Sequence, residues 1–174
     1  MEYTCSYSSP LGPITLASNG SFLTGLWFCG QKYFAATLGN HESGDFRRIP
    51  ALLSAIQWLN IYFSGKEPDF LPPLQPQGSD FRQAVWNALL EIPFGETTTY
   101  GDLAKTVGCA SSQAVGGAVG HNPISIIIPC HRVVGSNGSL TGYAGGIKKK
   151  VSLLQLEGAY TDKMYAPKSN LTLP

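Results

Sequence analysis

Residues 122–134 read NPISIIIPCHRVV, which places a thiol, Cys130, at the end of a strongly apolar run. Isoleucines 126–128 predict a buried segment, and Pro129 removes a backbone donor and stiffens the chain just before the cysteine. A thiol attacks as a thiolate, and because its ordinary pKa is about 8.5 it needs a base, a cation or a helix N-terminus nearby. His131 is the candidate base, and since neighbouring side chains of an extended chain point to opposite faces, we expect a bridging water to pass the proton. Without further context, a cysteine beside an isoleucine run is also typical of a small buried core residue.

Helical periodicity surrounds this stretch. Ser79 can cap a helix whose apolar residues continue to Ile92, and the spacing predicts two short helices over 100–106 and 112–119, the size of a helix-turn-helix. A closing helix over 147–156 follows, and we expect its three lysines, Lys148 to Lys150, to form a solvated face. The tail over 160–174 has little periodicity, which leaves open whether it is docked or frayed.

The first half has a different pattern. Short apolar runs broken by glycine and proline over 1–28 predict a small antiparallel sheet, and spacings of three and four over 49–63 predict an amphipathic helix. The proline-rich stretch 68–78 resembles a linker. We therefore expect an α+β protein with a structural domain over 1–76 and a functional, mainly helical domain over 77–174.

Composition narrows the classes of function. The 174 residues carry a net charge of +1, which argues against a polybasic tail or an electrostatically driven membrane binder. No apolar run approaches a membrane span, so we expect an intracellular protein. The four scattered cysteines suggest free thiols in a reducing compartment, although Cys5, Cys29 and His41 could be read as an irregular three-ligand zinc site.

The string from Pro129 to Val133 resembles the Pro-Cys-His-Arg-Val active-site signature of the O6-alkylguanine-DNA alkyltransferases, also called methylated-DNA–protein-cysteine methyltransferases. The resemblance runs from about Asp80 to Gly158, through PFGETTTYGDLA at 93–104, AVGGA at 114–118 and GYAGG at 142–146. In the first half only Ser9-Pro10-Leu11-Gly12 is similar to the family's opening hairpin. The family's fold is α+β, with a small N-terminal antiparallel sheet with helix and a C-terminal domain containing a winged-helix-like helix-turn-helix.

The resemblance implies direct-reversal DNA repair without a cofactor or metal. An alkyl group on guanine O6 in double-stranded DNA moves irreversibly to Cys130, once per molecule, and activity on thymine O4 is left open. By analogy Tyr100 donates a hydrogen bond to the departing guanine, Glu157 hydrogen-bonds His131 in a Cys–water–His–Glu relay, and Asn122 braces the cysteine loop. From spacing alone, Glu157 is more typical of a surface acid at a helix end, and Tyr143 can equally be a core residue. The base pocket implied by the family is lined by Val119, Val133, Tyr143 and Ala144.

The small residues of the second short helix suit close approach to DNA. The family inserts this helix into the minor groove and flips the damaged base out of the duplex. The residues that the resemblance places at the DNA are Gln113, Ala114, Val115, Gly116, Gly117 and Ala118. Gln113 stands where the family normally has an arginine, so we expect weaker base flipping or weaker duplex affinity.

Three other interpretations stay open. Non-catalytic alkyltransferase-like lesion-binding proteins share this architecture but lack the cysteine. A cysteine hydrolase would pair Cys130 with His131 or His121, although such enzymes take their catalytic Cys and His from distant positions. A phosphate loop at Gly116–Gly120 fits neither common glycine pattern. We expect a monomer with no membrane association and no obligate protein partner, cytoplasmic in a bacterium or archaeon or nuclear in a eukaryote.

Overall fold

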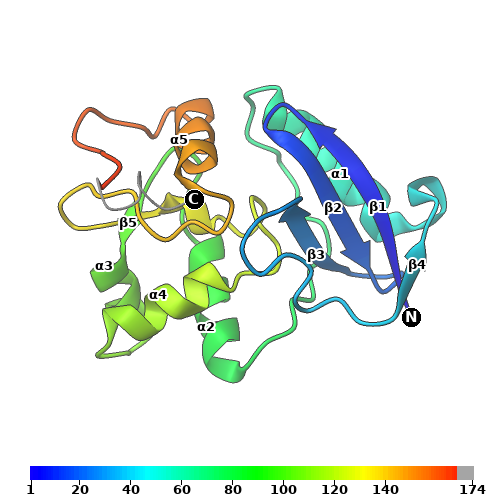
Figure 1. Ribbon diagram of the computed structural model, residues 1–174, viewed down its shortest axis with the longest axis horizontal. Coiled ribbons are helices and arrows are strands. Elements are labelled where there is room, and N and C mark those ends of the chain that lie inside the picture. The colour runs from blue at the N-terminus through cyan, green and yellow to red at the C-terminus, as the bar shows by residue number, and fades with distance from the viewer. Residues whose placement is uncertain (168–174) are drawn as a thin grey trace. The chain divides into compact units, whose positions relative to one another are not determined.

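A computed structural model describes residues 1–167 and divides the chain into two compact units (Figure 1). The N-terminal unit comprises Met1–Gly78 together with Pro123–Ile127. The C-terminal unit comprises Ser79–Asn122 and the chain from Ile128 onward. One segment of the N-terminal unit is thus supplied from within the sequence of the other half. No helix within residues 1–167 is long and apolar enough to cross a lipid bilayer.

The N-terminal unit is built on a four-stranded sheet in the order β3-β2-β1-β4. Strands β1 (Glu2–Ser9), β2 (Gly12–Ser18) and β3 (Leu23–Phe28) are antiparallel neighbours, as the sequence predicted. A fourth strand that the sequence did not predict, β4 (His41–Ser43), pairs with β1 in parallel and makes the sheet mixed. The reason is that residues 29–40 carry the chain from one edge of the sheet to the other, and such a crossover returns a strand in the parallel direction.

Helix α1 (Pro50–Phe63) covers this sheet (Figure 1) and follows a short 3-10 helix, η1 (Phe46–Arg48). Pro50 occupies the first turn, where its missing N–H costs no hydrogen bond. Every residue of β3 is buried. The helix side chains buried in this core are Ala51, Leu52, Ala55, Trp58, Leu59 and Tyr62.

The segment Pro123–Ile127 extends the backbone pairing of β3. The N–H of Leu26 donates to the carbonyl of Pro123 at 2.9 Å, and the N–H of Ser125 donates to the carbonyl of Leu26 at 2.9 Å. Ile126 then has a φ of +70°, and the N–H of Ile127 donates to the Ser125 carbonyl at 2.8 Å. This is a γ-turn of the rare, positive-φ kind, and a β-branched residue there is strained.

The C-terminal unit begins with three helices. Helix α2 (Asp80–Leu90) starts at Ser79, whose hydroxyl accepts from the N–H of Arg82, as the sequence predicted. Helices α3 (Tyr100–Thr106) and α4 (Ser112–Gly120) pack on each other and on α2. The indole N–H of Trp86 donates to the carbonyl of Ala118 at 2.9 Å and ties α2 to α4. The predicted helix-turn-helix is therefore present.

The remaining elements of the C-terminal unit include the short helix that carries Cys130. Strand β5 (Thr98–Thr99) pairs in parallel with β6 (Val133–Val134), and between them in the sequence lies the short 3-10 helix η2 (Cys130–Arg132). Helix α5 (Ile147–Leu156) packs against η2. The tail is docked as far as Tyr165, whose carbonyl accepts from the N–H of Leu140 at 2.8 Å. Residues 168–174 of the predicted tail lie outside the described residues.

Candidate active site

Cys130 is held at the first residue of η2 by backbone and side-chain hydrogen bonds. Its N–H donates to the carbonyl of Ile128 at 2.8 Å around Pro129, a γ-turn that suits the fixed φ of proline. The amide of Asn122 donates to the same Ile128 carbonyl at 2.8 Å. Asn122 therefore braces the turn that presents the thiol.

His131 and Glu157 form a buried pair behind the cysteine. Nε2 of His131 lies 2.5 Å from Oε2 of Glu157, and both side chains are fully shielded from solvent. Arg132 completes the cluster: its Nε donates to Oε1 of Glu157 at 2.7 Å, and its Nη1 donates to the carbonyl of Ile92 at 2.6 Å. Glu157 is therefore not the surface acid that its position at a helix end also allowed.

The protonation states of this pair follow from its surroundings. Burial tends to raise the pKa of Glu157, but the hydrogen bonds and positive charge of His131 and Arg132 lower it to about 2. Burial lowers the pKa of His131, and Glu157 opposes that effect. At neutral pH a Glu157 carboxylate thus accepts from Nε2–H of a neutral imidazole. Nδ1 of His131 then carries the lone pair, and within residues 1–167 it has no hydrogen-bond partner.

Cys130 is only 5% exposed. Burial raises the pKa of Cys130, and four influences oppose it: a hydrogen bond from Asn122, the charge of Lys150, and the backbone N–H groups of Cys130 and His131. A buried thiol with several groups that favour its anion is suited to nucleophilic attack rather than to passive packing.

Tyr100, the first residue of α3, is a hydrogen-bond donor at this site. Its hydroxyl donates to the carbonyl of Thr141 at 3.0 Å. Burial, followed by the effect of a charge on Cys130, raises the pKa of Tyr100 to about 12. The phenol therefore keeps its proton at neutral pH and can donate it in a hydrogen bond to an incoming base.

The four residues expected to line a base pocket differ in exposure. Val119, Val133 and Tyr143 are buried, whereas Ala144 is half-buried. The ring of Tyr143 lies edge-on to His131, with 6.5 Å between the ring centroids. Its hydroxyl is buried without a hydrogen-bond partner in the described part of the chain. Tyr143 is thus both packed in the interior and a neighbour of the candidate base.

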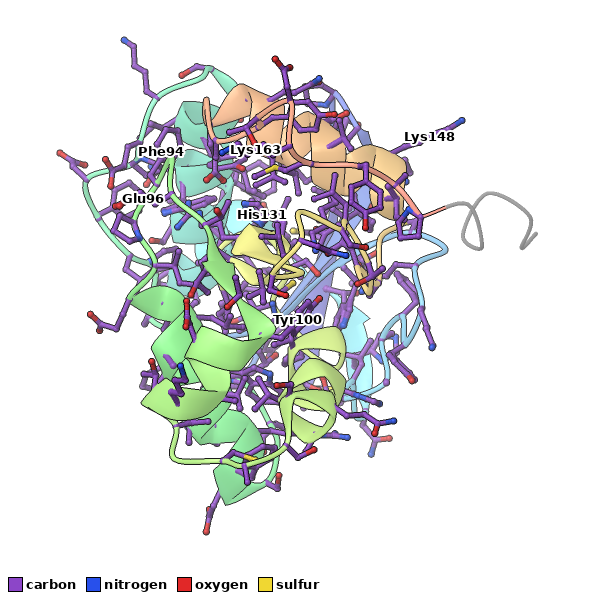
Figure 2. All side chains as sticks on the ribbon, turned by 90° about the vertical axis from the view of Figure 1, so that its left-hand side faces the viewer. Phe94, Glu96, Tyr100, His131, Lys148 and Lys163 are labelled. Carbon is purple, nitrogen blue, oxygen red and sulfur yellow. The ribbon has the colours of Figure 1, made fainter. Side chains whose placement is uncertain are left out.

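Lys150 is buried, although its sequence context predicts a solvated side chain. Lys148 is exposed and projects away from α5, whereas His131 lies in the interior of the unit (Figure 2). Lys150 is only 1% exposed, and its ammonium donates to the carbonyls of Val133 at 2.6 Å and Thr141 at 3.1 Å. The expectation of three solvated lysines was wrong for Lys150, because its position falls on the apolar face that Leu154 marks one turn later.

Only some of the residues of helix α4 that were predicted to bind DNA are exposed. Gln113, Ala114 and Gly117 are exposed and Gly116 is half-buried, next to the ring of Tyr100. In contrast, Val115 and Ala118 are buried against the neighbouring helices, so DNA contact through their side chains is excluded. The reason is the helical repeat, which turns residues 115, 118 and 119 toward the interior.

Two other candidates from the sequence are the zinc site and His121. No three side chains of His, Cys, Asp or Glu within residues 1–167 lie close enough together to bind a metal ion, and this includes Cys5, Cys29 and His41. Nδ1 of His121 is hydrogen-bonded to the Gly117 carbonyl at 2.7 Å, at the C-terminal end of α4.

Comparison with known proteins gives a consistent result. The family model "6-O-methylguanine DNA methyltransferase, ribonuclease-like domain" matches residues 3–76, and the model of the family's DNA binding domain matches residues 80–159. The methylated-DNA–protein-cysteine methyltransferase of Mycobacterium tuberculosis is 49% identical over 150 residues, covering 86% of this chain and 88% of that protein. Its counterpart in Methanosarcina acetivorans is 45% identical over 159 residues, covering 90% and 99%.

Solved structures agree. The crystal structure of the M. tuberculosis O6-methylguanine methyltransferase matches with a TM-score of 0.79 at 45% identity, covering 92% of this chain and 95% of that one. A structure of M. tuberculosis OGT in complex with DNA matches with the same TM-score and identity, covering 90% and 93%. These matches span both units of the fold, and we conclude that the chain belongs to the 6-O-methylguanine DNA methyltransferase family.

Proposed function

We propose that this protein repairs DNA by transferring the alkyl group of O6-alkylguanine from the duplex to Sγ of Cys130. The observation that carries the proposal is the braced thiol of Cys130 next to a histidine whose Nδ1 is free to accept a proton. Family membership supplies the reaction class. A cysteine at this position, with its histidine and glutamate, favours chemistry over lesion binding alone.

The proposed step is an in-line displacement at the alkyl carbon. The thiol proton passes to Nδ1 of His131 through a water, and the thiolate forms the new S–C bond while the C–O6 bond breaks. The electron pair of that bond remains on the guanine, which then takes up the proton given up by the thiol. The products are a stable thioether on Cys130 and an unmodified guanine, so each molecule acts once.

Tyr100 donates a hydrogen bond to the leaving group. A phenol with a raised pKa donates a hydrogen bond without losing its proton, and such a bond strengthens as negative charge builds on the departing base. In the described structure this hydroxyl donates to the Thr141 carbonyl. We infer that an incoming base takes over this donor.

The exposed face of α4 would meet the DNA. Ala114 and Gly117 present a methyl group and no side chain on the exposed side of the helix, next to Gln113, and this suits a close approach to DNA without reading of base edges. Because O6 is hidden within the duplex, the alkylated nucleotide must be extruded before transfer. We propose that the protein acts as a monomer. We also propose that it works in the reducing compartment that holds the DNA, because the Cys130 thiol must stay reduced.

Intact-mass spectrometry tests the proposal. Mixing the protein with a duplex containing one O6-methylguanine should add one methyl group to the protein, and peptide mapping should place it on Cys130. Cys130→Ser should stay unmodified, whereas Cys109→Ser should react like the wild type. Duplex binding without a change in protein mass would favour a lesion-binding protein, and repeated turnover of an ester substrate would favour a hydrolase.

A further inference from the structure

The buried ammonium of Lys150 has no acidic partner. The described chain, residues 1–167, contains an ion pair between Arg132 and Glu157, a His131–Glu157 contact and one surface pair, and none of them involves Lys150. A buried cation without a carboxylate is costly, and a neutral apolar side chain would avoid that cost. Groups of this kind are typical of functional sites.

The ionisable groups near Lys150 leave one candidate anion. Tyr100 of α3 donates to the Thr141 carbonyl that Lys150 also contacts, and burial raises the pKa of this phenol and that of Tyr143 in the loop before α5. The charge of Lys150 also lowers the pKa of His131, a group that can become positive but not negative. The charge of Glu157 is already matched by Arg132, and it also accepts a hydrogen bond from His131. The remaining group that can become negative is Cys130, and its ionisation and that of Lys150 influence each other.

The hydrogen bonds of Lys150 also bind the two chain segments that border the thiol. Val133 directly follows η2, and Thr141 belongs to the segment that Tyr100 contacts. A lysine ammonium has three N–H donors, and these two carbonyls use two of them. One donor thus remains for an anion.

We propose that Lys150 is the positioning residue that makes Cys130 reactive: its buried positive charge favours formation of the thiolate, and its two hydrogen bonds hold the cysteine turn and the Thr141 segment around that charge. This inference rests on the proposed function, because it explains how the acceptor thiol ionises. It adds a member, supplied by α5, to the Cys–His–Glu group.

The titration behaviour agrees with this role. Burial lowers the pKa of Lys150 to about 8, and a negative charge on Cys130 opposes that change. The ammonium is therefore charged at neutral pH, where the thiol must lose its proton. The substitution that separates the two roles is Lys150→Gln, which keeps donors for the carbonyls but removes the charge, whereas Lys150→Arg keeps both.

The experiment follows the rate of Cys130 alkylation against pH, from about pH 6 to about pH 10, for the wild type, Lys150→Gln, Lys150→Arg and the exposed control Lys148→Gln. Two reagents are used: a methylated duplex, and iodoacetamide with peptide mapping of Cys130. Circular dichroism and duplex affinity confirm that each variant is folded and binds DNA.

We expect Lys150→Gln to move the midpoint of the rate profile upward by one pKa unit or more. The corresponding loss is about tenfold or greater at neutral pH, and it should shrink as the pH rises. Lys150→Arg should stay within a few-fold of the wild type, and Lys148→Gln should not differ from it. A loss of equal size at every pH, or an unchanged midpoint, would overturn the proposal and leave Lys150 a purely structural tether.

The use of two reagents distinguishes a failure of this inference from a failure of the proposed function. If the wild type takes no methyl group from the duplex, the proposed function fails. The iodoacetamide profile still decides whether Lys150 favours the Cys130 thiolate, because that reaction needs no DNA.

Discussion

Oε2 of Glu157 accepts from Nε2 of His131 at 2.5 Å, while the other oxygen of the same carboxylate accepts from Arg132 at 2.7 Å. One buried carboxylate thus orients the candidate base and neutralises a buried guanidinium. Glu157→Gln removes the charge and leaves Arg132 unpaired in the interior. We expect the free energy of unfolding to fall by about 3–5 kcal/mol and the rate of alkyl transfer to decrease. Denaturant unfolding and the transfer rate measure the two effects, with the exposed Glu91→Gln as control; unchanged stability would contradict the assigned pairing.

The same carboxylate predicts a pH dependence of stability. The pKa of Glu157 is about 2 in the folded chain against an ordinary value of 4.5, so between these values the unfolded chain binds more protons. The stabilisation is fully present above the ordinary pKa and is lost as the pH falls toward about 2. The free energy of unfolding should therefore fall more steeply over this interval in the wild type than in Glu157→Gln. Parallel slopes would show that Glu157 is not the responsible group.

Removing the Tyr100 hydroxyl should impair transfer more than stability. Tyr100→Phe keeps the ring but loses the donor to Thr141 and, as we propose, to the leaving guanine. Loss of one such donor typically costs about 10²-fold in rate. Single-turnover kinetics on a methylated duplex measure the effect, and the binding affinity for the duplex should change little. A rate within a factor of about two of the wild type would exclude this role.

Gln113→Arg tests the departure from the family at the start of α4. Gln113 is exposed, and an arginine there would bring a cation and a planar stacking surface. We expect faster transfer from duplex DNA and a much smaller change with the free O6-methylguanine base, because only the duplex requires base extrusion. Comparing the two substrates in parallel isolates this step. Equal acceleration of both would point to an effect on the chemistry instead.

Gly117 tests the exposed face of α4. A Cβ added there meets no atom within 4 Å, and the residue is helical, so Gly117→Ala should stabilise the protein by about 1 kcal/mol. Gly117→Leu should also fold but should weaken duplex binding, since a large side chain prevents close approach. Transfer from the free base should be normal in both variants. Normal duplex affinity of Gly117→Leu would place the DNA elsewhere.

Local signals in the sequence were enough for much of the fold. Ser79 and Pro50 mark helix starts through hydrogen bonding and φ restriction that depend only on neighbouring residues, and both helices begin as expected. The cysteine, histidine and glutamate of the site were identified through the family signature. Their burial and hydrogen bonding could not be predicted from spacing, which for Glu157 favoured a surface acid.

Other features depend on contacts between distant parts of the chain. The parallel pairing of β4 with β1 has no local signature in three exposed residues. The burial of Val115 and Ala118 follows from packing of α4 on its neighbours. Lys150 falls on the same helical face as Ile147 and Leu154, which is a signal of burial, but a run of three lysines is more typical of a solvated face.

Because Pro123–Ile127 belongs to the N-terminal unit, the protein cannot be divided into two fragments at the boundary between its halves. A fragment starting at Ser79 would retain these five residues without Leu26, their backbone partner, and a fragment ending at Gly78 would lack them. Each fragment would expose unpaired backbone groups, and the fragment starting at Ser79 would also expose the isoleucines at 124, 126 and 127, which favours self-association. The protein is therefore two units in space but a single indivisible length of chain for expression, permutation or domain exchange.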